Sequence, residues 1–110
     1  MEGPLQERDW KYMRSIENEL LQELCSRINR QSAQILDDAE KTQHERYGEL
    51  YSHIKDSDRI IGDCFNDWSR SRLDMKIIFL RRHNLLTDEH VEGLSDSAQE
   101  WMKKMDEFPL

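Results

Sequence analysis

Apolar residues recur every three or four positions through most of this chain, which is the spacing of one face of an α-helix. The longest such stripe lies between residues 42 and 83, and it is apolar at eight of its ten positions. The ten positions are Tyr47, Tyr51, Ile54, Asp58, Ile61, Phe65, Trp68, Arg72, Met75 and Phe79. We therefore expect one long helix over residues 42–83, whose stripe forms a seam that requires a partner.

Local signals predict where this long helix begins and where it could be interrupted. Thr42 and Glu45 have the spacing of a capping box, in which hydroxyl and carboxylate each accept a hydrogen bond from the other residue's N–H. Asp56-Ser57-Asp58 could cap a new helix, and Gly62 costs about 1 kcal/mol relative to alanine. Because the stripe keeps its phase across both places, we expect a continuous helix with at most a bend at Gly62.

A second stripe predicts a first helix over residues 9–36, after a flexible lead-in at residues 1–8. Asp9 is the expected N-cap. The stripe consists of Trp10, Met13, Ile16, Leu20, Leu24 and Ile28, and it continues to Ile35 and Leu36. The turn at residues 37–41 contains no Gly or Pro, so one uninterrupted helix through this point stays an alternative.

Two short helices are expected over residues 88–106. Asn84 suits a left-handed residue that ends the long helix, while Thr87 and Ser95 suit the N-caps of the two helices that follow. No stretch alternates in the manner of a strand. The sequence therefore predicts a single all-α domain: an antiparallel helical hairpin with a long second helix, two short C-terminal helices covering its end, and a helical bundle on dimerisation.

Composition favours thin helical layers that associate. Only 36% of the 110 residues are hydrophobic and 35% are charged, and a small chain of this kind often completes its core by oligomerising. The net charge of −7 disfavours nonspecific binding to nucleic acid and to anionic membranes. With no apolar run long enough for a bilayer and no signal-peptide pattern at the start, we expect a soluble, cytoplasmic protein.

Few residues have the spacing that catalysis or metal binding requires. The pairs Glu40/His44 and Glu49/His53 are one helical turn apart, but neither has a further ligand on its face. Cys25 and Cys64 stand alone, and we expect both to be reduced helix residues. No glycine-rich loop is present to hold phosphate. We expect no enzyme activity, no cofactor and no metal.

Asp58 and Arg72 suggest how two copies could align. Each lies seven residues from Phe65, on opposite sides. If two long helices pack antiparallel about a dyad near Phe65, each Asp58 lies near the partner's Arg72. Charges placed on an apolar seam commonly fix its register. Alternatively, both residues reach solvent or pair with the first helix.

Two further groups of residues have alternative interpretations. Basic residues cluster between residues 69 and 83, either as an anion or nucleic-acid patch or as partners of acidic residues in the first helix and the tail, which we favour. The cluster consists of Arg70, Arg72, Lys76, Arg81 and Arg82. Trp10, Trp68 and Trp101 are expected to be core anchors, although three rings on apolar faces could also line a pocket.

Four short blocks resemble a known group of sequences. They are Glu7-Arg8-Asp9-Trp10-Lys11, His44-Glu45-Arg46-Tyr47, Phe65-Asn66-Asp67 with Arg70-Ser71, and Leu85-Leu86-Thr87-Asp88-Glu89. In these blocks, which are spread over most of its length, the chain resembles small, uncharacterised bacterial all-helical proteins. The resemblance implies a bacterial, cytoplasmic, all-helical protein and supplies no activity. Arg70-Ser71-Arg72-Leu73, with the capped helix at Thr87, is also similar to the helical domain of the GINS replication factors.

We expect a noncatalytic function: a small helical protein that acts through protein–protein association, as a homodimer or as an adaptor for another protein. One alternative is a small-molecule-binding or regulatory protein with an aromatic pocket between helices. Another is a nucleic-acid-associated factor that uses the basic cluster from Arg70 to Arg82.

Overall fold

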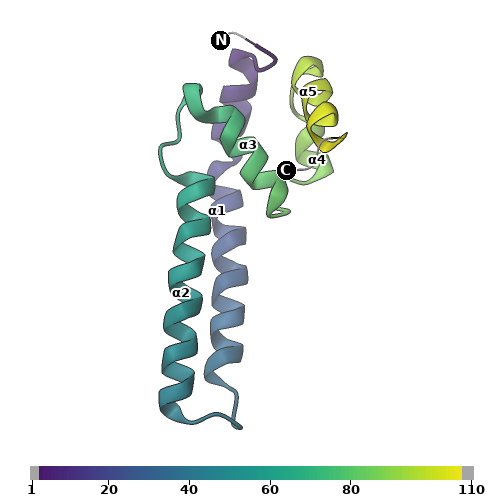
Figure 1. The fold of residues 1–110 in the computed structure, drawn as a ribbon. Helices are drawn as coiled ribbons and strands as arrows, with labels where there is room; N and C mark the ends of the chain where they lie inside the picture. The colour runs from purple at the N-terminus through teal and green to yellow at the C-terminus, as the bar shows by residue number, and fades with distance from the viewer. Residues whose placement is uncertain (1–2, 108–110) are drawn as a thin grey trace.

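The protein is entirely helical in a computed structural model, which describes residues 3–107 and contains no strand in that range. Its elements are α1 (Glu7–Leu36), α2 (Gln43–Phe65), a 3₁₀ turn η1 (Arg70–Arg72), α3 (Leu73–Arg82), α4 (Asp88–Glu92) and α5 (Asp96–Glu107). The all-α prediction is confirmed. Helices α1 and α2 form a long antiparallel hairpin, and α3 to α5 gather beside one end of it (Figure 1). The molecule is elongated, with extents of 53 × 26 × 21 Å.

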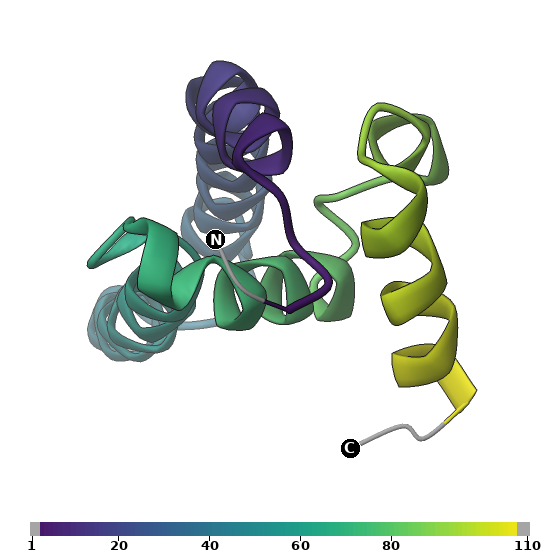
Figure 2. The same cartoon turned by 90° about the horizontal axis from the view of Figure 1, so that it is seen from above.

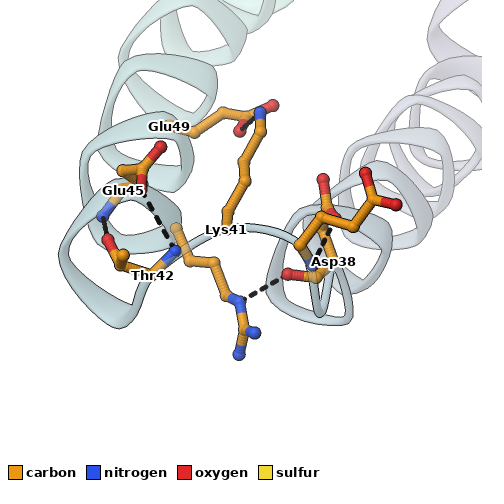
Figure 3. Close-up of polar contacts among 7 residues, drawn as sticks. Asp38, Lys41, Thr42, Glu45 and Glu49 are labelled. Atoms are coloured by element: carbon orange, nitrogen blue, oxygen red, sulfur yellow. Dashed lines mark hydrogen bonds and ion pairs between the residues drawn. The ribbon is translucent and has the colours of Figure 1, made fainter.

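The hairpin turn excludes one uninterrupted helix through residues 37–41. The Thr42 hydroxyl accepts a 3.1 Å hydrogen bond from the Glu45 amide, and the Thr42 amide donates to the Glu45 carboxylate at 3.2 Å (Figure 3). Arg46 donates from Nε to the Asp38 carbonyl at 2.7 Å, which ties α2 back to the end of α1. Lys41 forms an ion pair with Glu49 on the other side of the turn (Figure 3). The predicted capping box is therefore present.

The start of α1 differs from the prediction. The helix begins at Glu7, and Asp9 lies within its first turn instead of serving as N-cap. The Asp9 carboxylate reaches back to accept a 2.8 Å hydrogen bond from the amide of Gln6. The lead-in is also not free of contacts, since Leu5 is buried and the Pro4 carbonyl accepts a hydrogen bond from Ser97. Residues 1–2 of the predicted lead-in lie outside the described range.

The predicted continuous helix over residues 42–83 is wrong, because α2 ends at Phe65. Asn66 is extended and Asp67 has a φ of 57°, a left-handed conformation that Asp tolerates better than most residues. Lys76 of α3 donates from Nζ to the Asp63 carbonyl at 2.9 Å, which satisfies a carbonyl that the end of α2 leaves without a helical partner. The helix passes through Gly62 without a break.

The core lies where the first half of α1 meets α3, α5 and the loops between them. Its most fully buried apolar side chains are Met13, Leu20, Leu73, Ile77, Leu80, Leu85, Leu86, Leu94 and Ala98. The predicted caps hold this end together: Asn84 has a φ of 56°, Thr87 accepts from the His90 amide, and Ser95 accepts from the Ala98 amide. The rest of the hairpin is only two helices thick (Figures 1 and 2).

Candidate association surface on the hairpin

The first half of the predicted seam points away from α1. Tyr47, Tyr51 and Ile54 are 67%, 63% and 40% exposed. The residues that face α1 come instead from a neighbouring stripe, formed by Leu50, His53, Ser57 and Cys64. His53 shows this orientation directly, because its Nε2 lies 3.0 Å from the Ile28 carbonyl of α1. Part of the seam is thus an exposed apolar surface.

The second half of the seam is divided by the break after Phe65. Ile61, Phe65 and Trp68 are partly buried against the core, and the last two rings stack at 6.0 Å. Arg72 belongs to η1 and therefore lies on a different element from Asp58. The proposed pairing of Asp58 with Arg72 across a straight antiparallel helix pair loses its geometric basis, because no straight helix joins the two residues.

A second stripe in α1 accompanies the exposed part of the seam. In the two-helix part of the hairpin, Leu24, Ile28 and Ile35 face α2. The residue that directly follows each of these three belongs to a second stripe, which has the same three- and four-residue spacing and contains no charged residue. This stripe consists of Asn18, Gln22, Cys25, Asn29, Ser32 and Leu36. Leu36 is 52% exposed.

Helix geometry places the two stripes on the same side of the hairpin. In α2, the residues one position after the inward-facing ones are Tyr51, Ile54, Asp58 and Phe65. Each single-residue step turns about 100° around a helix axis. Because α1 and α2 are antiparallel, the chain winds clockwise along one helix and anticlockwise along the other when both are viewed from the same end. Their inward-facing residues also point in opposite directions, toward each other. A step of one residue past the inward-facing position therefore leads to the same side of the hairpin in both helices. They form one broad surface, which we call the uncharged face.

The uncharged face is defined by twelve positions. They are the six stripe residues of α1 together with Tyr47, Tyr51, Ile54, Asp58, Ile61 and Phe65 of α2. Only Asp58 among the twelve is charged, in a chain of which 35% is charged. The opposite side of the hairpin, one position before the inward-facing residues, carries Glu23, Arg27, Glu49, Asp56 and Asp63.

Helices α3 to α5 leave most of the uncharged face open, although Ile61 and Phe65 at one end of it pack against the core. Arg27, on the charged side, donates to the carbonyls of His83 and Asn84 at 2.8 and 3.0 Å, which places the end of α3 on that side. Figure 2 shows α4 and α5 displaced from the hairpin in one direction. The uncharged face therefore lies on the other side, away from α4 and α5.

The basic cluster is largely occupied by contacts within the chain. Arg70 forms a two-pronged pair with Glu7 at 2.8–3.0 Å and lies 5.1 Å from the centre of the Trp10 ring. This hydrogen bond lowers the pKa of the Glu7 carboxyl. Lys76 is buried, and its ammonium binds backbone carbonyls at the end of α2. A third cation of the cluster also has partners within the chain. Three of the five cations, Arg70, Lys76 and Arg81, are therefore engaged within the chain.

Arg81 is that third cation. It donates to the Leu86 carbonyl at 2.8 Å and to the Asp88 carboxylate at 3.0 Å. Arg72 and Arg82 are exposed, and neither has a carboxylate within 4.0 Å among residues 3–107. The favoured interpretation, in which these cations pair with acidic residues of the chain, describes Arg70 and Arg81, whose partners are Glu7 and Asp88. Lys76 binds backbone carbonyls instead.

Histidine and cysteine side chains do not converge. Over the described range, no group of three His, Cys, Asp or Glu residues has the arrangement of a metal site. His90 lies between the Thr87 amide and the Glu19 carboxylate, at 3.0 and 2.9 Å. Both cysteines are free, and burial raises the pKa of the Cys64 thiol to about 11. Within residues 3–107, no helix combines the length and apolar character needed to cross a membrane.

Neither protein-family models, nor curated proteins, nor solved structures provide a match for this chain. The resemblance to small bacterial helical proteins therefore stays a prediction.

Proposed function

We propose that this protein is a noncatalytic association module, in which two copies pack their uncharged faces together and form a four-helix bundle. The observation that carries the proposal is the absence of charge at eleven of twelve positions, together with the exposure of Tyr47 and Tyr51. Centres of protein interfaces are depleted in charged residues and enriched in tyrosine. Paired hairpins are a standard route to a four-helix bundle.

A second copy is the partner that fits this surface best. Two chains of net charge −7 repel each other, so a contact between copies has to be made where charge is excluded. A basic partner would be attracted instead to the charged side of the hairpin, with Glu23, Glu49, Asp56 and Asp63. A symmetric dimer also uses one surface twice, so a single uncharged face is sufficient.

The size of the uncharged face is adequate for association. Residues 18–36 extend over about 27 Å at 1.5 Å per residue. Two helices packed 8–10 Å apart present a width of about 18 Å. The face therefore measures about 500 Å² per copy, or about 1,000 Å² for two copies, which is near the lower limit for a specific interface. Pairing also gives the thin half of the hairpin its missing second layer.

Two neighbouring substitutions test the proposal. Tyr51→Glu places a charge on the uncharged face, whereas Ser52→Glu places the same charge on an exposed position that points away from it. We expect Tyr51→Glu to weaken dimerisation at least about a hundredfold in sedimentation equilibrium, because a carboxylate loses its water in the interface. Ser52→Glu is expected to leave dimerisation unchanged. Equal behaviour of the two variants contradicts the proposal.

A further inference from the structure

A cleft of about 550 Å³ separates α3 from α5, on the part of the molecule away from the uncharged face. Its apolar lining consists of Ile77, Ile78, Leu86, Trp101, Met102 and Met105. Helix α5 is anchored at its beginning, where Ala98 is fully buried, and it then passes the end of α3 (Figure 2). Trp101, Met102 and Met105 place the second half of α5 along the cleft.

Charged side chains at the cleft are unequal in their availability. Arg81 and Asp88 line the cleft but form an ion pair with each other, so each largely neutralises the charge of the other. Arg82 lies 5.5 Å from the centre of the Phe79 ring, which orients its guanidinium without neutralising it. Asp106 also lines the cleft, from the last turn of α5, where its side chain is exposed. Arg82 is therefore the cation that the cleft offers to a ligand.

We propose that this cleft binds a small amphipathic carboxylate, with its apolar body between α3 and α5 and its carboxylate on Arg82. The cleft lies within the volume range of small-molecule sites, and its apolar walls with a few polar groups match their usual character. Met102 and Met105 can adjust their shape to an apolar body. A guanidinium binds a carboxylate through charge-assisted hydrogen bonds that a neutral head group cannot reproduce.

The test uses octanoate, decanoate and dodecanoate as probes, with decanol and decylamine as matched controls for the head group. Binding is followed by NMR, through the indole N–H signals of Trp101, which lines the cleft, and of Trp68, which does not. We expect decanoate to shift the Trp101 signal in a saturable manner and to leave the Trp68 signal in place. Decanol and decylamine are expected to bind more weakly than decanoate.

Variants separate the two parts of the proposed ligand. Arg82→Ala is expected to weaken decanoate binding about tenfold through loss of the charged hydrogen bonds, whereas Arg72→Ala, which changes an exposed arginine outside the cleft, leaves it unchanged. Met105→Glu is expected to abolish binding. Thermal unfolding without ligand shows that each variant is folded.

Several outcomes overturn the inference. They are absence of a saturable shift, equal binding of decanoate and decanol, and equal effects of Arg82→Ala and Arg72→Ala. Because the cleft and the uncharged face share no residue, these outcomes leave the proposed dimer unaffected, and failure of the dimer leaves the cleft unaffected.

Discussion

The carboxylate of Asp9 accepts two 2.7 Å hydrogen bonds from Ser95, one from its backbone amide and one from its hydroxyl. Both residues are buried, and they lie 86 positions apart in the chain. The contact joins the first turn of α1 to the N-cap of α5. It therefore closes the fold around its core from the two ends of the described chain.

Replacement of Asp9 by alanine should destabilise the protein strongly. It leaves the amides of Gln6 and Ser95 and the Ser95 hydroxyl without their acceptor, and we expect a loss of about 3 kcal/mol in the free energy of unfolding, measured by urea denaturation. Asp56→Ala, at an exposed position within α2, is the control and should change this energy by less than about 0.5 kcal/mol. Similar changes in the free energy of unfolding for the two variants would show that the Asp9–Ser95 contact contributes little to stability.

Glycine-to-alanine substitutions at two positions should have opposite effects. A methyl group at Gly93 would lie 2.4 Å from Cζ of Tyr12, so Gly93→Ala forces the ring to move and should cost about 1–3 kcal/mol of stability. A methyl group at Gly48 meets nothing within 4 Å, so Gly48→Ala should stabilise α2 by about 1 kcal/mol. Thermal unfolding of both variants gives the comparison, and stabilisation by Gly93→Ala would contradict the described packing of α4 against α1.

The buried thiol of Cys64 makes stability depend on alkaline pH. Its pKa is raised from 9.0 to about 11 in the folded protein, so between these values the unfolded chain loses a proton that the folded chain keeps. Stability should therefore fall as pH rises from about 9 to about 11, by about 2 kcal/mol in total. Urea denaturation at several pH values measures this fall. Cys64→Ala should lower stability at neutral pH but reduce the dependence of stability on pH between about 9 and 11. If this dependence is unchanged in the variant, groups other than Cys64 cause it.

Much of the fold is readable from local signals. The spacing of apolar residues predicts α1 and α2 because a helix buries one face, whatever its neighbours are. Thr42, Asn84, Thr87 and Ser95 mark helix ends correctly because a cap depends on hydrogen bonds within a few residues of itself.

The end of α2 at Phe65 could not be predicted from local signals of this kind. Asn66 and Asp67 fall between apolar positions, so the stripe keeps its phase across a place where the helix ends. The donor that satisfies the end of α2 is Lys76, which the sequence places in a basic cluster rather than in the interior. Only the path of the chain in three dimensions brings them together.

The uncharged face could not be predicted from such signals either. Its α1 half is polar, from Asn18 to Ser32, and resembles an ordinary solvated surface. It gains meaning only when the inward-facing residues of both helices are known and the two stripes are found on the same side. The sequence pattern predicts that the exposed residues Tyr47 and Tyr51 belong to an association surface, and the proposed dimer uses both residues in its interface.

The molar mass in solution shows whether two copies of the chain associate. Light scattering over a dilution series, at low and at high salt, is expected to give twice the chain mass of 13.3 kDa at both salt concentrations. High salt should favour the dimer slightly, since it screens the repulsion between two chains of charge −7 while the contact itself contains little charge. A mass of one chain at all concentrations would exclude the proposed dimer, and a dimer that dissociates in high salt would show that the contact depends on charge.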